Sequence, residues 1–249
     1  MVNMKKISFG LLLLLANGLA AQITDPKLTE VWSPEPRVVM PGVATRPPSD
    51  AIVLFDGSSS LAANEWLMAK DSSAFGWTLN RDSSMTVKPG TGLIQTKRVF
   101  GDCQLHVEFR EPSVVKGEGQ GRGNSGIFLQ GRYEVQVLDC YGNRTYSNGQ
   151  TASIYKQHIP LVNACRKPGE WQTYDIIYKA PQFNADGIRI APGYVTVLHN
   201  GVLVENHVEI KGTTEYIGLP QNKAHGKGPL QLQDHGDLVS FRNIWIREL

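Results

Sequence analysis

The sequence is poor in cysteine and in net charge. Three cysteines in 249 residues, with no CxxC and no Cys/His pair at zinc-finger spacing, exclude a disulfide miniprotein and give no sign of a zinc finger. Because three is odd, at most one internal disulfide can form, and one thiol is left over. The formal net charge of +2 gives no electrostatic reason to expect nucleic acid or an anionic membrane as a partner.

Long hydrophobic runs are also missing. The run Leu11–Leu15 is too short to span a bilayer, and it follows Lys5-Lys6 and precedes small residues ending at Ala21. That order is typical of a secretory signal peptide, which we place at residues 1–21. We expect a periplasmic or secreted protein with no membrane insertion after signal cleavage.

Residues 22–50 contain six prolines and little periodicity, which indicates an extended leader rather than a domain. From Ala51 onward the pattern is that of β-strands. Turn residues separate short alternating runs, and Asn200-Gly201 between two Val-rich runs predicts a hairpin. No βαβ alternation is present, so a Rossmann fold and a TIM barrel are excluded. Residues 51–249 are therefore predicted to form one all-β domain, a sandwich of two sheets.

Chemistry-bearing side chains alternate with core residues in the run Tyr133–Leu138. Glu134 and Gln136 share one face, and Asp139 follows them. The resulting Glu-x-Gln-x-x-Asp is similar to the Glu-x-Asp-x-(x)-Glu strand of retaining jelly-roll β-glucanases, whose first Glu is the nucleophile and whose last is the acid. Gln136 cannot act as an acid. Taken alone, this strand is better explained by an ordinary exposed polar face.

Two further runs present polar faces. Gln231, Gln233 and His235 form one, opposite Leu230 and Leu232. The run Cys103–Arg110 presents the other, which consists of His106, Glu108 and Arg110. Three strands thus offer long hydrogen-bonding side chains suited to sugar hydroxyls, although structural roles account more readily for His106 and Arg110. The Gly-rich stretch 117–123, which leads into Asn124, is not a phosphate loop. It forms either a simple turn or a rim loop over a ligand.

With these segments in order, the chain resembles the 3-keto-disaccharide hydrolase family over residues 51–249. The matching pieces are Leu54–Gly57 with Trp66, Gly92–Thr96, Leu105–Arg110, Asn124–Ile127, Tyr133–Asp139, Ser153–Tyr155, Pro168–Trp171, Val197–Gly201, Gly228–Gly236 and Phe241–Ile244. The resemblance implies a concanavalin A-like jelly-roll sandwich of two antiparallel sheets with a concave polar face. It also implies action on glycosides oxidised at C3.

A ketone at C3 acidifies the hydrogen on C2, so such a reaction needs a base, a stabiliser for the oxyanion at O3 and an acid for the leaving oxygen. We predict Glu134 as acid/base and His235 as second acid/base or metal ligand. Substrate contacts are predicted for Gln136, Gln233, Glu108, Asp139, Tyr155 and Asn124. No cofactor is required. A divalent metal chelated by O2 and O3 would fit the route, although no spaced His/Asp cluster indicates one.

The predicted function is that of an exported enzyme acting on a small saccharide or glycoside. Two alternatives stay open at this point: a lectin-like carbohydrate-binding module without turnover, and an inert structural domain. The co-facing of Glu134 and His235 separates them, because a lectin needs neither an acid nor a base.

Overall fold

The computed structural model describes residues 24–43 and 45–249. The predicted signal peptide lies outside the described residues. The chain divides into two units, with the boundary between Val38 and Val39. The described part of the first unit contains one 3-10 helix, η1 (Pro26–Thr29), which begins at Asp25 with a carboxylate cap on the Lys27 N–H. Over the described residues, no helix has the length and apolar character needed to cross a membrane.

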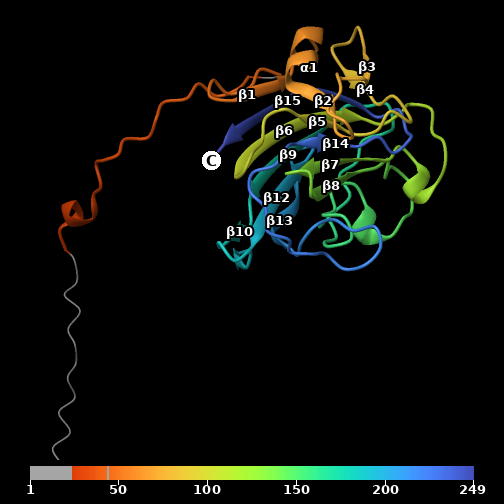
Figure 1. The fold of residues 1–249 in the computed structure, drawn as a ribbon. Helices are drawn as coiled ribbons and strands as arrows, with labels where there is room; N and C mark the ends of the chain where they lie inside the picture. Colours follow the sequence, from red (N-terminus) through yellow and green to blue (C-terminus); the bar gives the residue numbers. More distant parts are fainter. Residues whose placement is uncertain (1–23, 44) are drawn as a thin grey trace, which may run out of the picture. The chain divides into compact units, whose positions relative to one another are not determined.

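The second unit is built from two large antiparallel sheets and a short ribbon (Figure 1). The eight-stranded sheet contains β13 (Val202–Ile210), β12 (Gly193–His199), β9 (Gln172–Lys179), β6 (Cys103–Arg110), β15 (Ser240–Glu248), β4 (Met85–Thr86) and β3 (Thr78–Leu79) in that order, with β1 (Ile52–Phe55) also paired to β15. The five-stranded sheet has the order β2 (Trp66–Met68), β5 (Ile94–Thr96), β14 (Gln231–Leu232), β7 (Ser125–Leu129) and β8 (Tyr133–Val137). The ribbon pairs β10 (Gln182–Phe183) with β11 (Arg189–Ala191).

Helices are few and short. One α-helix, α1 (Ser59–Glu65), follows β1, and Ser58 caps it by accepting from the Leu61 N–H. Two 3-10 turns, η2 (Gly119–Gly121) and η3 (Ser147–Gly149), lie in the connections around β7 and β8. The prediction of an all-β jelly-roll sandwich of two antiparallel sheets is confirmed.

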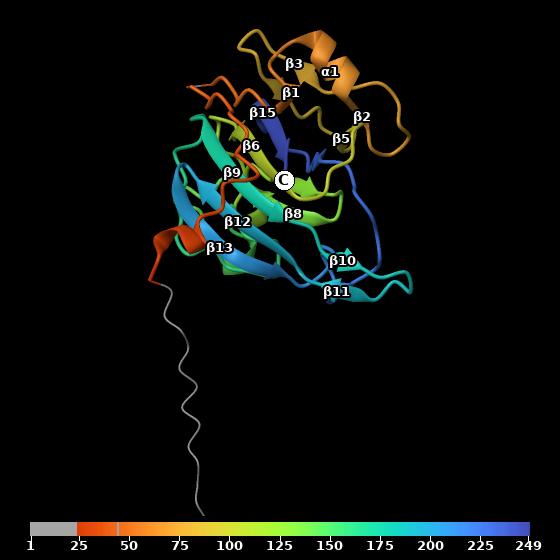
Figure 2. The ribbon, with the colours of Figure 1, turned by 90° about the vertical axis from the view of Figure 1, so that its left-hand side faces the viewer.

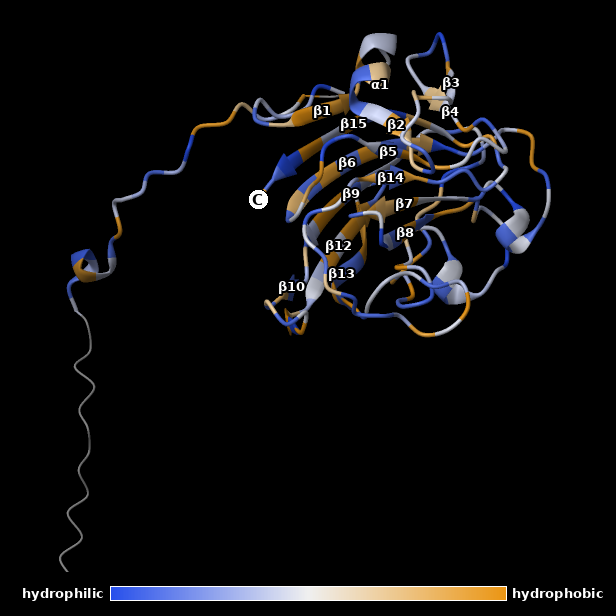
Figure 3. Cartoon of the chain, in the orientation of Figure 1, coloured by the Kyte–Doolittle hydropathy of each residue, from blue (hydrophilic) through white to orange (hydrophobic). Residues whose placement is uncertain are grey.

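Strict alternation places the core between the two sheets. Leu105, Val107 and Phe109 of β6 are fully buried, and so are Val135 and Val137 of β8. All five belong to one hydrophobic cluster. Hydrophobic residues gather in the strands, whereas the connections are largely hydrophilic (Figure 3). The predicted inward-facing residues Tyr133, Leu230 and Leu232 are buried as well, which confirms the register expected for both strands.

Buried hydroxyl and amide groups join the sheets through this core. Tyr174 of β9 donates its hydroxyl hydrogen to the Gln136 backbone oxygen of β8 at 2.7 Å. Tyr178, two residues on, donates to Gln130 Oε1 at 2.7 Å. Strands β9, β12 and β13 run side by side in the larger sheet (Figure 2). The backbone of β8 is therefore anchored from behind, which leaves its other face free to carry a site.

The Asn200-Gly201 hairpin forms as predicted between β12 and β13. Both turn residues have positive φ, 53° and 79°, and His199 pairs with Val202. Two consecutive positive φ values define a type I′ turn, whose twist matches that of the flanking strands.

Candidate functional site

A polar cavity of about 240 Å³ lies on the outer face of the five-stranded sheet. We call it the sugar cavity. Its lining residues are Asn124, Phe128, Glu134, Gln136, Tyr155, Thr214, Tyr216, Gln233 and His235. Six of the eight residues predicted to carry chemistry are among these nine: Asn124, Glu134, Gln136, Tyr155, Gln233 and His235.

Strand register brings the sugar cavity together. In the antiparallel pair of β7 and β8, Phe128 lies opposite Glu134, and Gly126 lies opposite Gln136. On the other side of β7, the Gln233 N–H donates to the Gly126 oxygen at 3.0 Å, one residue beyond the end of β14. Side chains from three neighbouring strand positions therefore share the face that points away from the core. His235 lies beyond the strand, in an exposed loop.

Glu134 provides a buried carboxyl in the sugar cavity, and the pKa of this carboxyl is raised. Its side chain belongs to a residue only 5% exposed, and burial raises the pKa of its carboxyl to about 8. The amide of Gln136 contacts it: the orientation that satisfies both ends of that amide has the nitrogen donate to Glu134 Oε1 at 3.1 Å. Within residues 24–43 and 45–249, no ion pair reaches Glu134. A carboxyl buried without a cation keeps its proton near neutral pH and can act as an acid.

Gly126 provides the space that this carboxyl occupies. A Cβ atom added at Gly126 would lie 2.4 Å from Glu134 Oε1 and 3.0 Å from Glu134 Cδ. Contacts this short do not occur, so any side chain here would displace the carboxyl. The glycine of the Asn124-Ser125-Gly126 segment is therefore required by Glu134 itself.

An unsatisfied acceptor points to a ligand hydroxyl. Gln233 Oε1 is buried and finds no donor among the described residues. The Gln233 backbone is held firmly, since the Ser125 hydroxyl donates to the Gln233 oxygen at 2.7 Å. Buried amide oxygens are nearly always paired, so a bound molecule that donates a hydroxyl hydrogen here would complete the site.

An aromatic rim borders the sugar cavity beside Glu134. Tyr155 is 8% exposed, and its hydroxyl lies 2.5 Å from the Tyr146 hydroxyl. Burial raises the pKa of Tyr155, and the neighbouring Tyr146 and Glu134 raise it further. Tyr216, which is 71% exposed, lies under the Lys156 ammonium, 4.4 Å from the ring centroid. Flat rings at a sugar site are suited to stacking on the apolar face of a pyranose.

Three lining residues were missed by the sequence reasoning. Phe128 alternates with buried Ile127 and Leu129, so its position in the strand could have indicated it. Thr214 and Tyr216 lie between β13 and β14, where no periodic pattern exists to mark them. Thr214 contributes directly, because its hydroxyl oxygen accepts from the Glu134 N–H at 2.9 Å.

Glu108 does not reach the sugar cavity, in contrast to the sequence expectation. It lies on β6 of the other sheet, where Arg242 Nε donates to it at 2.6 Å and Asn243 Nδ2 at 2.8 Å. Burial by itself would raise the pKa of Glu108, but hydrogen bonds from His106, Asn243 and Arg242 outweigh it and lower the pKa to about 2. The alternating pattern was interpreted correctly, but it cannot tell which sheet a strand joins.

The other groups of that strand are structural too. Burial opposes a charge on His106, yet the hydrogen bonds that it donates to Asp175 and Glu108 raise its pKa to about 9. Its ring stacks on Trp245 with centroids 5.1 Å apart. Arg110 pairs with Asp82 at 3.0 Å rather than with either neighbouring glutamate.

Asp139 is also outside the sugar cavity. Arg122 Nε donates to Asp139 Oδ2 at 2.7 Å, and both residues line a second, larger cavity. The strand ends at Val137, so the period of two no longer holds at Asp139. The third acidic position of the glucanase-like pattern is therefore occupied by a structural ion pair.

The three cysteines, Cys103, Cys140 and Cys165, are free thiols, and Cys103 is buried. Across the part of the chain that the structure describes, no three or more His, Cys, Asp or Glu side chains gather in a group that could hold a metal ion.

A two-sheet jelly roll with a cavity of amide, carboxyl and aromatic groups is the architecture of a carbohydrate-active protein. The chain belongs to the family of 3-keto-alpha-glucoside-1,2-lyase-like domains, which matches residues 50–247.

Solved structures agree with this assignment. The chain is 55% identical to a proposed glycosyl hydrolase from Parabacteroides distasonis ATCC 8503, with 90% of this chain and 97% of that one covered and a TM-score of 0.85. Two further proposed glycosyl hydrolases from the same organism share the fold: one is 21% identical over 80% of this chain and 94% of that one, with a TM-score of 0.58, and the other is 23% identical over 80% and 99%, with a TM-score of 0.54. No curated protein matches the chain.

Proposed function

We propose that this protein is an exported enzyme that cleaves 3-keto-glycosides by elimination followed by hydration, with hydrolysis as the net result. The observation that carries the proposal is the buried carboxyl of Glu134, whose pKa is raised to about 8 within a cavity it shares with an imidazole and three amides. A group with such a pKa is matched to proton transfer near neutral pH.

The chemistry begins at C2. A base takes the C2 proton, and the electron pair of that C–H bond passes into the C2–C3 bond, which leaves an enediolate with negative charge on O3. We assign this base to His235, whose exposed imidazole lies at the mouth of the sugar cavity. The amide nitrogen of Gln233 is suited to stabilise the developing oxyanion.

Loss of the aglycone follows. The enediolate electrons form a C1–C2 double bond while the C1–O bond breaks, and Glu134, protonated at neutral pH, delivers its proton to the leaving oxygen. Water then adds at C1, the resulting Glu134 carboxylate accepts a proton from it, and C2 is reprotonated. The sum is 3-keto-glycoside plus water to 3-keto-sugar plus alcohol. This route needs no close pair of carboxylates, which agrees with glutamine at position 136.

The test compares two substrates and two variants. Wild-type protein should release p-nitrophenol from the 3-keto form of p-nitrophenyl glucoside and not from ordinary p-nitrophenyl glucoside. Glu134→Gln keeps the shape of the side chain but cannot exchange the proton, so its kcat should fall by about 100- to 10,000-fold while substrate still binds. Glu170→Gln, at an exposed position, is the matched control and should retain full activity. Full activity in Glu134→Gln would contradict the assignment.

Binding without turnover is the second candidate function. The exposed ring of Tyr216 and the unpaired Gln233 oxygen would serve a lectin-like module equally well. Titration calorimetry with methyl glucoside and its 3-keto form separates the two: binding of either sugar, with no product from the 3-keto form, would favour the module.

A further inference from the structure

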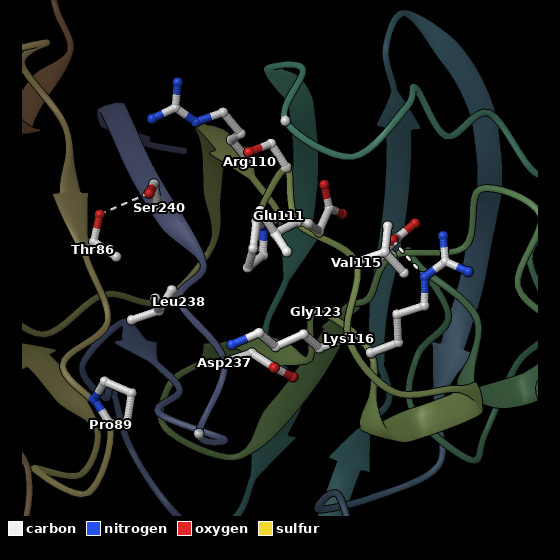
Figure 4. A pocket seen from close by; sticks show the side chains of 17 residues that line it. Thr86, Pro89, Arg110, Glu111, Val115, Lys116, Gly123, Asp237, Leu238 and Ser240 are labelled. Carbon is white, nitrogen blue, oxygen red and sulfur yellow. Dashed lines mark hydrogen bonds and ion pairs between the residues drawn. The ribbon is translucent and has the colours of Figure 1, made fainter.

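A second cavity is larger than the sugar cavity. Its volume is about 790 Å³, and it lies where the β4–β5, β6–β7 and β14–β15 connections meet (Figure 4). We call it the loop cavity. Three of its lining side chains are exposed aliphatic groups: Val114 at 68%, Val115 at 48% and Leu238 at 54%. Apolar side chains gathered in one open hollow mark a place where something binds.

The two cavities share a wall. Gly123 lines the loop cavity and the next residue, Asn124, lines the sugar cavity; likewise Gly236 lines the loop cavity and His235 the sugar cavity. The Asn124 N–H donates to Asp237 Oδ2 at 2.8 Å, which fastens these two segments together. At the exposed position of Gly236 the wall carries no side chain, and a Cβ there would meet no atom within 4 Å. A ligand in the sugar cavity can therefore extend over this edge into the loop cavity.

Most polar groups around the loop cavity already have partners. Gln172 Nε2 donates to both Glu111 oxygens, at 3.0 and 2.7 Å. The hydroxyls of Thr86 and Ser240 lie 2.7 Å apart, and Arg122 is held by Asp139. A second sugar needs several convergent donors and acceptors, and these are occupied.

Lys116 has no such partner. Within the described parts of the chain, its ammonium has no hydrogen bond or ion pair, and its side chain extends toward the segment of Asp237 and Leu238 (Figure 4). The Asp237 carboxylate in that segment accepts from the Asn124 N–H through Oδ2. The loop cavity thus offers an aliphatic wall and, at its edge, the unpaired ammonium of Lys116.

We infer that the loop cavity receives the aglycone of the glycoside, and that the aglycone it favours is an aryl group bearing a carboxylate rather than a second sugar. The inference rests on the proposed function for the sugar cavity. The volumes agree with it. Pockets for drug-sized ligands span roughly 300–1,000 Å³. The loop cavity, at about 790 Å³, lies within this range, and the sugar cavity, at about 240 Å³, lies below it. An aromatic ring would lie on Val114, Val115 and Leu238, and its carboxylate would face Lys116.

The experiment uses four 3-keto-glucosides that differ only in the aglycone: methyl, phenyl, 4-carboxyphenyl and glucosyl. We expect the highest kcat/KM for the 4-carboxyphenyl compound. Leu238→Ser should lower kcat/KM about tenfold for both aryl compounds and leave the methyl compound within about twofold, because it removes apolar contact with the ring alone. Lys116→Met should reduce the preference for 4-carboxyphenyl over phenyl by about fivefold, as expected for one exposed charge pair. Leu161→Ser, at 63% exposure and outside both cavities, is the control and should change nothing.

Three outcomes would overturn the inference: a preference for the glucosyl compound over both aryl compounds, equal losses for methyl and aryl compounds in Leu238→Ser, or no effect of that variant on any of them. Calorimetry with ordinary 4-carboxyphenyl and methyl glucosides measures binding without turnover. The inference about the loop cavity and the proposed reaction can therefore be tested separately. Tighter, Leu238-dependent binding of the aryl glucoside without any turnover would support the loop cavity and reject the reaction. Normal turnover of the methyl 3-keto-glucoside, together with no effect of Leu238→Ser on the aryl compounds, would support the proposed reaction and reject the loop cavity as the aglycone site.

Discussion

Glu108 and Glu134 occupy equivalent places in the two large sheets, yet their carboxyls are in opposite states. Each follows a buried residue in an alternating strand, and the exposures are close, 7% and 5%. Glu108 is surrounded by Arg242, Asn243 and His106, which hold its pKa at about 2 despite burial. Glu134 has an amide neighbour and no cation, so burial raises its pKa to about 8. Burial therefore does not distinguish a structural carboxylate from a reactive one; the partners do.

The first prediction concerns catalysis, where we expect the two glutamates to differ most. Glu134→Gln should lose about 100- to 10,000-fold in kcat on a 3-keto-glycoside, whereas Glu108→Gln should stay within about threefold of wild type. The physical reason is that Glu108 neutralises a neighbouring arginine and faces no cavity. Steady-state kinetics on both purified variants decides it, and a comparable loss of kcat in Glu108→Gln would undo the contrast.

The second prediction concerns Gly126, which leaves the space that the Glu134 carboxyl occupies. Gly126→Ala puts a Cβ only 2.4 Å from Glu134 Oε1, so the carboxyl must move by about an ångström, and a misplacement of that size costs about 100-fold in rate. Gly121→Ala is the matched control, because a Cβ there meets no atom within 4 Å and the residue's φ is not in the left-handed region. Activity of Gly126→Ala equal to that of Gly121→Ala would show that the Glu134 position is not critical.

The third prediction concerns the free energy of unfolding, which should fall more on substitution of Glu108 than on substitution of Glu134. Glu108→Gln weakens the charged hydrogen bonds with Arg242 and His106, and we expect its free energy of unfolding to fall by about 2 kcal/mol. Glu134→Gln should lose no stability at neutral pH, since it replaces a poorly solvated acid with a neutral amide. Urea denaturation of both variants at pH 7 measures this, and a less stable Glu134→Gln would indicate a structural role for that carboxyl.

The last pair of predictions concerns the pH dependence of stability. The folded-state pKa of Glu134 lies above its ordinary value, so folded protein binds the proton more tightly and loses stability as pH rises from about 5 to 8. The free energy of unfolding of Glu134→Gln relative to wild type should therefore rise over this range, with a slope of at most about 1.4 kcal/mol per pH unit.

Glu108 should behave in the opposite way. Its pKa is lowered, so its stabilising contribution is present above about pH 4.5 and is lost as pH falls through about 2. The stability difference between wild type and Glu108→Gln should then shrink in acid while that for Glu134→Gln is unaffected there. Thermal unfolding from pH 2 to 8 tests both curves, and parallel curves for the two variants would contradict the assigned pKa directions.

Much of this site could be predicted from the sequence because a strand has a period of two. The alternation in Tyr133–Leu138 fixed Glu134 and Gln136 on the face away from the core, and the same period of two in Leu230–His235 placed Gln233 and His235 on a second polar face. The same reasoning placed Glu108 with them, because alternation is a property of one strand and contains no information on which sheet that strand joins. Asp139 was misplaced for a related reason: the period was extended past the end of the strand.

The sequence by itself determined the strands, the faces they turn to the core and the hairpin at Asn200-Gly201, since each depends on residues close together in the chain. Only the tertiary structure decided which polar face became a cavity. Gln233 meets Gly126 across 107 positions, Thr214 reaches Glu134 across 80, and Arg242 neutralises Glu108 across 134. Whether a buried carboxyl meets a cation or an open cavity is fixed by contacts of this range, and no local pattern records them.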